Sequence, residues 1–345
     1  MSAAALVQER FAAQGLAGEP LDGPVAVAER LLAVQGQDPR GFRLAIRART
    51  KDLAAADVDR ALSEERSLVV TWLNRGTLHL VRSEDYPWLQ ALTTPPLLTS
   101  CARRLRQEGV APEEGERAVA TIERALADEG PLTRLDLKDR LQSAGVATGG
   151  QALIHLLFLA AVRGVAVRGP MVGRQHAYAL VRDWLGEPPM VEREAALAEL
   201  ARRYLVGHAP ASDRDLARWA GLPLRDARAG LEAIAAELQE LDGGLVRLRK
   251  RRPRGVEIPP PRLLGAFDPV LLGWTSREAI IGPHTVLVTR NGIFHPFALV
   301  DGRAVARWRW IKGEVVLEPF EEIPGEVGEA LAAEAADVTR FLAQA

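Results

Sequence analysis

Two glutamines and an aspartate stand within four residues, where Gln35, Gln37 and Asp38 are interrupted only by Gly36. A glutamine side chain can orient a water molecule through its carbonyl oxygen and can place a negative dipole beside a developing positive charge. It cannot act as a general base of useful strength. Asp38 could supply a carboxylate for that purpose, or it could cap a helix end. The stretch therefore offers water positioning and electrostatic stabilisation, with one residue able to do acid–base chemistry.

The spacing of apolar residues places the two glutamines at the end of a predicted helix. Val25, Ala28, Leu31 and Leu32 recur at helical spacing, which predicts a helix over 25–35 that stops before Pro39. Because residues i and i+2 do not share a helix face, both amides can point into one cleft only if the backbone breaks at Gly36. The alternative is an ordinary helix C-terminus with polar side chains in water, which this stretch alone favours.

The composition indicates a soluble globular protein without a general attraction to nucleic acid. Hydrophobic residues make up 48% and charged residues 26% of 345 residues, and the net charge of −1 means that any basic surface must be local. The single cysteine, Cys101, excludes a disulfide framework, and the six histidines show no ligand motif. No apolar run approaches the roughly 20 residues that span a bilayer, and the N-terminus predicts a helix instead of a signal peptide. We expect a cytoplasmic protein with no metal, cofactor or membrane contact.

Helices followed by a strand pair recur along the chain, and this order predicts winged helices. The first copy has predicted helices over 6–14, 25–35 and 57–64, and strands over 68–73 and 77–81. The second has helices over 113–127, 132–141 and 149–163, and strands over 165–167 and 177–181. The third has helices over 193–205, 213–220 and 224–238, and a strand over 245–248.

From residue 256 onward the apolar periodicity changes to two, which indicates short strands. They are predicted over 263–267, 279–281, 285–289, 297–300, 304–310 and 314–318, before a helix over about 325–342. The predicted fold class is therefore α+β, with three tandem winged-helix modules over 1–110, 111–190 and 191–255. A small C-terminal β-barrel or sheet domain follows over 256–345. Three modules in one chain, with no evident dimer segment, predict a monomer.

Four stretches of the chain form a recognisable set. They are LAVQGQDP at 32–39, WLNRGTLHLV at 72–81, AFDPVLLG at 266–273 and VDGRAVARW at 300–308. In that order they resemble the winged-helix DNA glycosylases of the AlkZ/YcaQ type. That family is built of tandem winged helices and a β-barrel and excises alkylated purines, and some members unhook interstrand crosslinks made by natural genotoxins. The resemblance implies double-stranded DNA as the partner.

The resemblance also implies catalytic residues. The family's signature is Gln, an apolar residue, then Gln or Asp, and here it falls on Gln35 and Gln37, with Gly36 departing from the apolar middle position. Hydrolysis of an N-glycosidic bond passes through a sugar cation, which amide dipoles can stabilise. Because amides are poor bases, the leaving purine must already be activated, as cationic N3- or N7-alkylpurines are. No lysine adjoins Gln35 closer than Lys51, so a lyase step is not indicated.

Arginines are the candidates for phosphate contacts. The set expected to face DNA is Arg40, Arg43, Arg47, Arg49, Arg75, Arg249, Arg251 and Arg252. For the four that follow the glutamines, the alternative is ion pairing on a helix surface. For the run 247–254, the alternative is a solvated basic linker. His79 is better explained as a hydrogen-bonded residue of a wing than as a catalyst.

The sequence therefore predicts a monofunctional DNA glycosylase for alkylated bases, acting in base excision repair on the nucleoid in the cytoplasm. The alternative is a non-catalytic winged-helix DNA-binding protein or transcription regulator, and a protein-binding scaffold is a third possibility. The orientation of Gln35 and Gln37 discriminates between them. A shared concave surface favours the enzyme, whereas burial of both amides in a module core favours the others.

Overall fold

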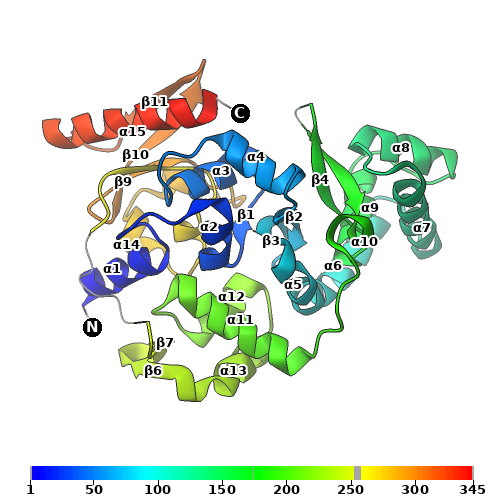
Figure 1. Ribbon diagram of the computed structural model, residues 1–345, viewed down its shortest axis with the longest axis horizontal. Helices are drawn as coiled ribbons and strands as arrows, with labels where there is room; N and C mark the ends of the chain where they lie inside the picture. The colour runs from blue at the N-terminus through cyan, green and yellow to red at the C-terminus, as the bar shows by residue number, and fades with distance from the viewer. Residues whose placement is uncertain (1, 174, 252–257, 344–345) are drawn as a thin grey trace. The chain divides into compact units, whose positions relative to one another are not determined.

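The computed structural model describes residues 2–173, 175–251 and 258–343 (Figure 1). The chain divides into two compact units. Unit 1 comprises Met1–Val58 and Leu197–Ala345, and unit 2 comprises Asp59–Ala196. Each unit is built of helices and small sheets, which agrees with the mixed α and β composition expected from the sequence. The module boundaries at residues 110, 190 and 255, and the number of winged-helix modules, stay predictions.

Unit 2 is organised around one antiparallel sheet. Its strands are β2 (Leu68–Leu73), β3 (Thr77–Arg82), β4 (Ala166–Val172) and β5 (Gln175–Leu180). Val70 on β2 lies opposite Arg168 on β4, so the two hairpins pair in the order β3-β2-β4-β5. The two strand pairs that the sequence assigned to separate wings therefore share a sheet.

The helices of unit 2 bury the apolar surface of this sheet. They are α5 (Tyr86–Thr93), α6 (Pro95–Gln107), α7 (Pro112–Glu129), α8 (Arg134–Ser143), α9 (Ala152–Val162) and α10 (Val181–Leu185). Helix α9 is apolar on nearly every side and packs against α6, α7, β2 and β4. A helix that is hydrophobic all round belongs in a core. Trp72 of β2 completes this core against Phe158 and Tyr178, with ring centroids 5.7 and 6.4 Å away.

Unit 1 is built of a second set of helices and of two small sheets. The helices are α1 (Ala3–Ala13), α2 (Gly23–Leu31), α3 (Pro39–Arg47), α12 (Asp213–Ala220), α13 (Leu224–Ala233), α14 (Glu278–Ile281) and α15 (Gly325–Ala343), and α4 (Ala55–Ser63) and α11 (Arg193–His208) extend across its limits. The strands are β1 (Val34–Gln35), β6 (Leu238–Leu241), β7 (Leu245–Leu248), β8 (Arg262–Leu264), β9 (Phe297–Val300), β10 (Arg303–Ile311) and β11 (Glu314–Pro319).

One order of elements recurs in the two units. In unit 2, α7 is followed by Leu132, which bridges to Tyr178, and then by α8, α9 and the β4–β5 hairpin. In unit 1, α11 is followed by Ala211, which bridges to Val246, and then by α12, α13 and the β6–β7 hairpin. The second helix of each set begins with a capping box, formed by Thr133 in one and Ser212 in the other. This is the order that the sequence predicted for a winged helix.

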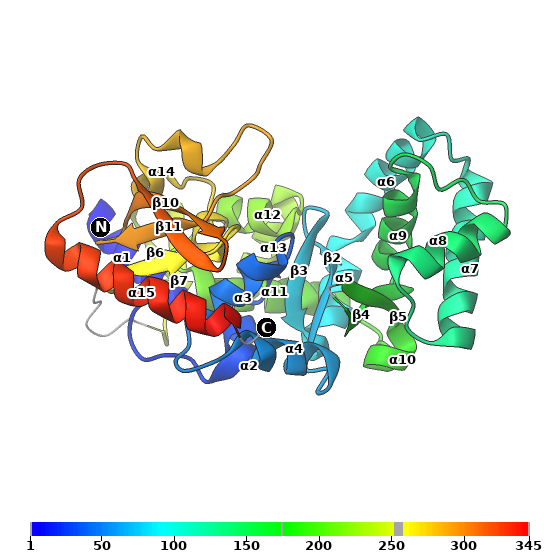
Figure 2. The ribbon, with the colours of Figure 1, turned by 90° about the horizontal axis from the view of Figure 1, so that it is seen from above.

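The C-terminal part of unit 1 is a small open sheet with a helix across it. Its strands run in the order β11-β10-β9-β8, and α15 contacts both edge strands, β8 and β11 (Figure 2). The turn between β9 and β10 has positive φ at Asp301 and Gly302, as a tight hairpin requires. A closed barrel is not among the described sheets.

Several predicted elements were wrong. The strands expected over 279–281 and 285–289 are the single-turn helix α14 and a 3-10 helix (Thr285–Leu287), because short apolar runs do not distinguish a strand from a helical turn. The helix expected over 224–238 ends at Ala233 and gives way to β6. Helices α3, α5 and α6 were not predicted; each carries a proline in its first turn, where proline favours helix initiation.

Helix α3 lies unusually close to the segment that follows β8. A Cβ atom added to Gly41 would come within 2.3 Å of the carbonyl oxygen of Ala266, and one added to Gly265 within 2.9 Å of Leu44 Cβ. Real Cβ atoms do not approach a backbone oxygen so closely. Glycine at position 41 therefore permits α3 to pack directly on the AFDPVLLG segment, which was one of the stretches that carried the resemblance.

We expect Gly41→Ala to destabilise the protein by about 1–3 kcal/mol, because backbone atoms must shift to admit the methyl group. The measurement is the midpoint of urea unfolding. Gly328→Ala is the matched control: it also places alanine inside a helix, but no atom lies within 4 Å of its added Cβ. The control should be neutral or stabilising by roughly 0.5–1 kcal/mol. Equal effects of the two substitutions would show that the close approach at Gly41 is unimportant.

Candidate active site

The two glutamines are joined by a hydrogen bond. Gln35 Nε2 donates to Gln37 Oε1 over 2.7 Å. Helix α2 ends at Leu31, Leu32 takes a φ of 63°, and the chain then runs extended through β1. In extended backbone, residues i and i+2 point to the same face. The backbone therefore departs from the helix at Leu32, earlier than the break expected at Gly36, and this brings the two amides together.

The members of the pair differ in exposure. Gln35 is 6% exposed, whereas Gln37 is an exposed residue. The buried Gln35 donates one hydrogen bond to the carbonyl oxygen of the exposed Gln37. The second lone pair of this Gln37 oxygen stays available. The NH2 group of Gln37 has no hydrogen-bond partner among the residues that the structure describes. The arrangement can present an oriented acceptor and two donors to a bound molecule.

Asp38 caps α3. Its Oδ1 atom accepts hydrogen bonds from the backbone N–H groups of Arg40 and Gly41, at 2.8 and 2.9 Å, and Pro39 occupies the first turn. An aspartate in this position satisfies backbone donors that the helix leaves unpaired. Of the two roles that the sequence left open, the structure shows the cap.

A cavity of about 350 Å³ opens directly beside the motif. Its lining includes Asp38 and Arg40 on one side and β10 residues on the other, among them Trp310. His295 also lines it, and burial together with the positive charge of Arg307 lowers the pKa of His295. Ligand pockets in proteins have volumes of about 300–1,000 Å³. The cavity is thus large enough to receive a small ligand or a base next to Gln37.

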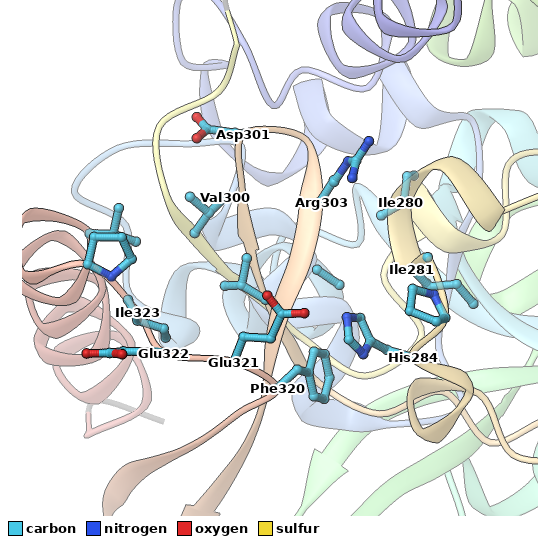
Figure 3. Close-up of a pocket in the computed structure, with 16 residues that line it drawn as sticks. Ile280, Ile281, His284, Val300, Asp301, Arg303, Phe320, Glu321, Glu322 and Ile323 are labelled. Carbon is cyan, nitrogen blue, oxygen red and sulfur yellow. The ribbon is translucent and has the colours of Figure 1, made fainter.

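A second cavity, of about 400 Å³, lies elsewhere in unit 1 (Figure 3). Ile280 and Ile281 line one side, and Val300 and Ile323 line another. The rings of His284 and Phe320 stack there, 4.1 Å apart. None of the residues predicted for the active site lines this cavity.

Arg49 does not face a DNA cleft, contrary to the sequence-based expectation. Its side chain is 0% exposed and forms a bidentate ion pair with Asp268, at 3.0 and 2.9 Å. It also donates to Gln14 O, Gln14 Oε1 and Ala45 O. All five guanidinium N–H groups are thereby used. The residue is structural because no donor remains for a phosphate.

The DNA contact predicted for Arg47 is also wrong, because this side chain is buried and paired as well. Its side chain is 3% exposed and pairs with Glu334 and Asp337 of α15, at 2.5 and 2.7 Å. A further hydrogen bond runs to Leu263 O. The guanidinium therefore ties α3 to α15 and to β8, which is the ion-pairing alternative, here in a buried form.

The other arginines differ in exposure. Arg43 is 7% exposed, donates to Pro39 O and lies over the ring of Phe42. Arg40, Arg249 and Arg251 are exposed, and Arg75 is half-buried in the turn between β2 and β3. Arg252 lies outside the described residues. Exposure permits phosphate contacts by Arg40, Arg249 and Arg251, which stay predictions.

His79 is a buried neutral residue of β3. Its pKa is lowered to about 3, chiefly by burial and also by the charge of Arg75, while a hydrogen bond between Nδ1 and Thr77 O acts in the opposite direction. A histidine with this pKa is a weak base. Its place in the hairpin agrees with the wing residue expected from the sequence.

Comparison with known proteins identifies the family. The model of the DNA glycosylase AlkZ-like family matches residues 28–341. An interstrand DNA cross-link repair glycosylase of Streptomyces sahachiroi is 30% identical, with 93% of this chain and 92% of that protein covered. The solved structure of the S. sahachiroi DNA glycosylase AlkZ superimposes with a TM-score of 0.82 at 27% identity, covering 99% of this chain and 96% of that one. The chain belongs to the AlkZ-like DNA glycosylase family.

Within this AlkZ-like chain, sequence reasoning missed Asp268. It is fully buried, and besides holding Arg49 it accepts a hydrogen bond from Val270 N at 3.0 Å. The available signal was a lone carboxylate inside an apolar run, since a buried charge requires a partner. Among the described residues, no cluster of His, Cys, Asp and Glu could hold a metal ion. In the same part of the chain, no helix is both long and apolar enough to cross a membrane.

We expect Asp268→Asn to lower the free energy of unfolding by about 3–5 kcal/mol, because the buried Arg49 charge would lose its counter-ion. Urea unfolding measures this loss. Glu65→Gln is the control: it breaks an ion pair with Arg60 whose side chains are 48% and 51% exposed. Solvent screens such a pair, so its loss should have little effect. If Asp268→Asn were as mild as the control, the ion pair would not hold α3 in place.

Proposed function

We propose that this chain is a DNA glycosylase that hydrolyses the N-glycosidic bond of cationic N3- or N7-alkylated purines, with Gln35 and Gln37 as its catalytic pair. The observation that carries the proposal is the hydrogen bond from Gln35 to an exposed Gln37, whose neighbour Asp38 lines a cavity. Two amides joined by a hydrogen bond form a neutral, preorganised site. Membership of the AlkZ-like family supports the reaction class.

The reaction assigns a separate task to each participant. The bond between C1′ and the purine nitrogen breaks, and its electron pair leaves with the base, which becomes neutral. Gln37 Oε1 stabilises the positive charge that develops on the sugar, and the pair orients the water whose oxygen bonds to C1′. The water loses its proton to solvent. Gln35 acts as a positioning residue, because its Nε2 group holds the carbonyl oxygen of Gln37 in place.

The substrate class follows from the weakness of the amides. Neither glutamine can remove a proton from water before attack, so the enzyme relies on a leaving group that already carries a positive charge. Uracil and hypoxanthine lack this activation and should not be released. The name of the S. sahachiroi relative supports extending the proposal to crosslinks, whose unhooking requires the same bond cleavage at an alkylated purine.

The cavity beside Asp38 is our proposed site for the alkylated base or its adduct. It begins one residue after Gln37, and Trp310 provides an aromatic wall on which a base can stack. Arg40 at its edge is positioned for a phosphate contact. We assign further backbone contacts to Arg43, Arg75, Arg249 and Arg251, and also to Arg252, which lies outside the described residues.

The alternative of a non-catalytic winged-helix regulator is less well supported. A purely structural pair of glutamines would be expected to lie together inside a core, whereas only Gln35 is buried and Gln37 is exposed. The proposed enzyme acts as a monomer on double-stranded DNA in the cytoplasm. A regulator would instead recognise paired half-sites as a dimer.

Gln37→Ala should reduce release of N7-methylguanine by about a hundredfold or more while DNA affinity is kept, because the lost interaction acts in the transition state. Free base released from methylated duplex DNA under single-turnover conditions measures the effect. Gln37→Asp should retain activity, since the related signature accepts a carboxylate there. Gln142→Ala, at an exposed glutamine of α8, is the background control.

Asp38→Ala tests the division of roles. It should cost about 1 kcal/mol of stability through loss of the helix cap and leave base release nearly intact. A folded but inactive Asp38→Ala enzyme, or efficient release of uracil by the wild type, would transfer the catalytic role to Asp38.

The pH profile of base release should be flat between about pH 6.5 and 9, because neither catalytic amide titrates. Below this range, stability should fall. Burial lowers the pKa values of His79 and His208 to about 3, whereas unfolded histidine has a pKa of about 6.5. The unfolded state thus binds protons that the folded state does not, and stability is lost as the pH falls from about 6.5 toward 3.

Single-turnover rates, recorded beside circular dichroism at each pH, separate catalysis from unfolding. Loss of rate below about pH 6.5 should coincide with loss of structure. A titration limb between pH 6.5 and 9 in the folded enzyme would contradict a mechanism that uses only amides.

A further inference from the structure

Unit 1 has a cavity of about 230 Å³ whose polar lining is mostly guanidinium. Arg30 of α2, Arg247 of β7 and Arg251 line it, together with a single carboxylate, that of Glu9. Its apolar wall consists of small or aliphatic residues, namely Ala12, Ala13, Leu205, Val206, Ala209 and Leu248. Three arginines and one glutamate leave two positive charges beside an apolar surface. Such surroundings strengthen electrostatic interactions relative to water.

The one carboxylate is already engaged. Glu9 Oε2 accepts from Arg247 Nη1 over 2.7 Å, and their side chains are 17% and 13% exposed. Arg247 Nε also donates to Gln239 Oε1 over 3.1 Å. The ion pair with Glu9 joins β7 to α1, and the bond to Gln239 joins β7 to β6. Arg247 is therefore neutralised and forms part of the wall.

Arg30 and Arg251 have no such partner. Within the described part of the chain, neither guanidinium forms a hydrogen bond or ion pair. Burial lowers the pKa of Arg30, the charge of Arg251 also lowers it, and Glu29 acts in the opposite direction. Two like charges that repel each other in a half-enclosed cavity would be stabilised by an anion between them.

The frame around Arg30 is rigid. A Cβ atom added to Gly207 of α11 would lie 2.3 Å from Arg30 O, so the end of α2 packs directly on α11. Gln14 Nε2 donates to Gly207 O over 3.1 Å, and Arg203 Nη2 donates to Glu29 O over the same distance. The backbone that carries Arg30 is thus fixed from two helices. A fixed backbone reduces the ordering cost when the Arg30 side chain binds an oxyanion.

We propose that Arg30 and Arg251 together hold one phosphate group, and that this phosphate belongs to the DNA backbone. Arg30 lies five residues before Gln35, so their Cα atoms are at most about 18 Å apart. This distance corresponds to roughly five nucleotide rises of 3.4 Å along one strand. The phosphate would fix the strand a few nucleotides from the base that the glutamine pair acts on. The choice of DNA rests on the proposed function.

The first test measures binding to an undamaged duplex, so it does not depend on base release. Arg30→Gln, Arg251→Gln and the double variant are compared with wild type by fluorescence anisotropy over a series of KCl concentrations. Each single variant should reduce the slope of log K against log salt by about 0.9, the value for one phosphate contact. The double variant should lose about the same amount, because both arginines hold one phosphate.

Arg225→Gln is the matched control. Arg225 belongs to α13 in the same unit, its side chain is 86% exposed, and it does not line the cavity. Its affinity and slope should equal those of the wild type. Unchanged slopes in both single variants would overturn the proposal. A double variant that loses about 1.8 would show two separate contacts and overturn the shared site.

The second test uses inorganic phosphate alone, at an ionic strength matched with chloride. Phosphate should raise the Tm of the wild type and of Arg225→Gln, because it binds the folded state, and it should not raise that of Arg30→Gln. Without phosphate, Arg30→Gln should be at least as stable as the wild type, since it removes a like-charge repulsion. Protection by phosphate together with an unchanged DNA slope would overturn the assignment to DNA in favour of a free phosphate ligand.

These outcomes are separate from those of the proposed catalysis. Failure of the wild type to release methylated bases would leave the salt slopes and the phosphate protection as they are. The converse result is release of N7-methylguanine by the wild type while Arg30→Gln and Arg251→Gln leave the salt slopes unchanged. That result would overturn the proposed phosphate site without affecting the proposed role of the glutamine pair.

Discussion

The buried ion pair between Arg49 and Asp268 is the constraint on which the surroundings of the glutamines depend. A buried charge is tolerated only when it is paired and its hydrogen-bonding capacity is filled. Arg49 meets this condition through five donors that reach α1, α3 and the segment after β8. Arg49 therefore ties three distant parts of the chain to one another. Since both partners are fully buried, salt in the solvent screens their interaction little.

This constraint reaches the candidate active site through α3. The helix is fixed just beyond its C-terminal end by Arg49, in its last turn by Arg47, and at its start by the Asp38 cap. Between these points Gly41 lets it lie directly on the backbone at Ala266. Gln37 precedes the cap by one residue and is held by Gln35. An exposed side chain is thus carried on rigid backbone, which is the condition for electrostatic preorganisation.

Local signals in the sequence were sufficient for much of this fold. The strand over 68–73 was predicted at its observed bounds from a β-branched run. Helix α12 was also predicted at its observed bounds, from the capping residue Ser212. What the sequence did not reveal depends on distant partners. Arg49 and Asp268 are 219 residues apart, so no local pattern distinguishes Arg49 from an arginine that contacts DNA. The helix break at Leu32 was hidden for a similar reason, since a positive φ in leucine is maintained by tertiary packing.

A neutral pair of amides suits a substrate that brings its own charge. In an N7-alkylated nucleotide the positive charge lies on the base, and during bond cleavage it passes to the sugar. A carboxylate at this position would attract the cation in the bound substrate as well as in the transition state, so part of its attraction would be uniform binding that does not accelerate the chemical step. An amide carbonyl exerts a shorter-ranged, dipolar attraction, which becomes strong only when the charge arrives at the atom beside it. In the proposed mechanism the gain would therefore be concentrated in the transition state, and the hydrogen bond from Gln35 limits the motion of Gln37 Oε1 that would reduce this gain.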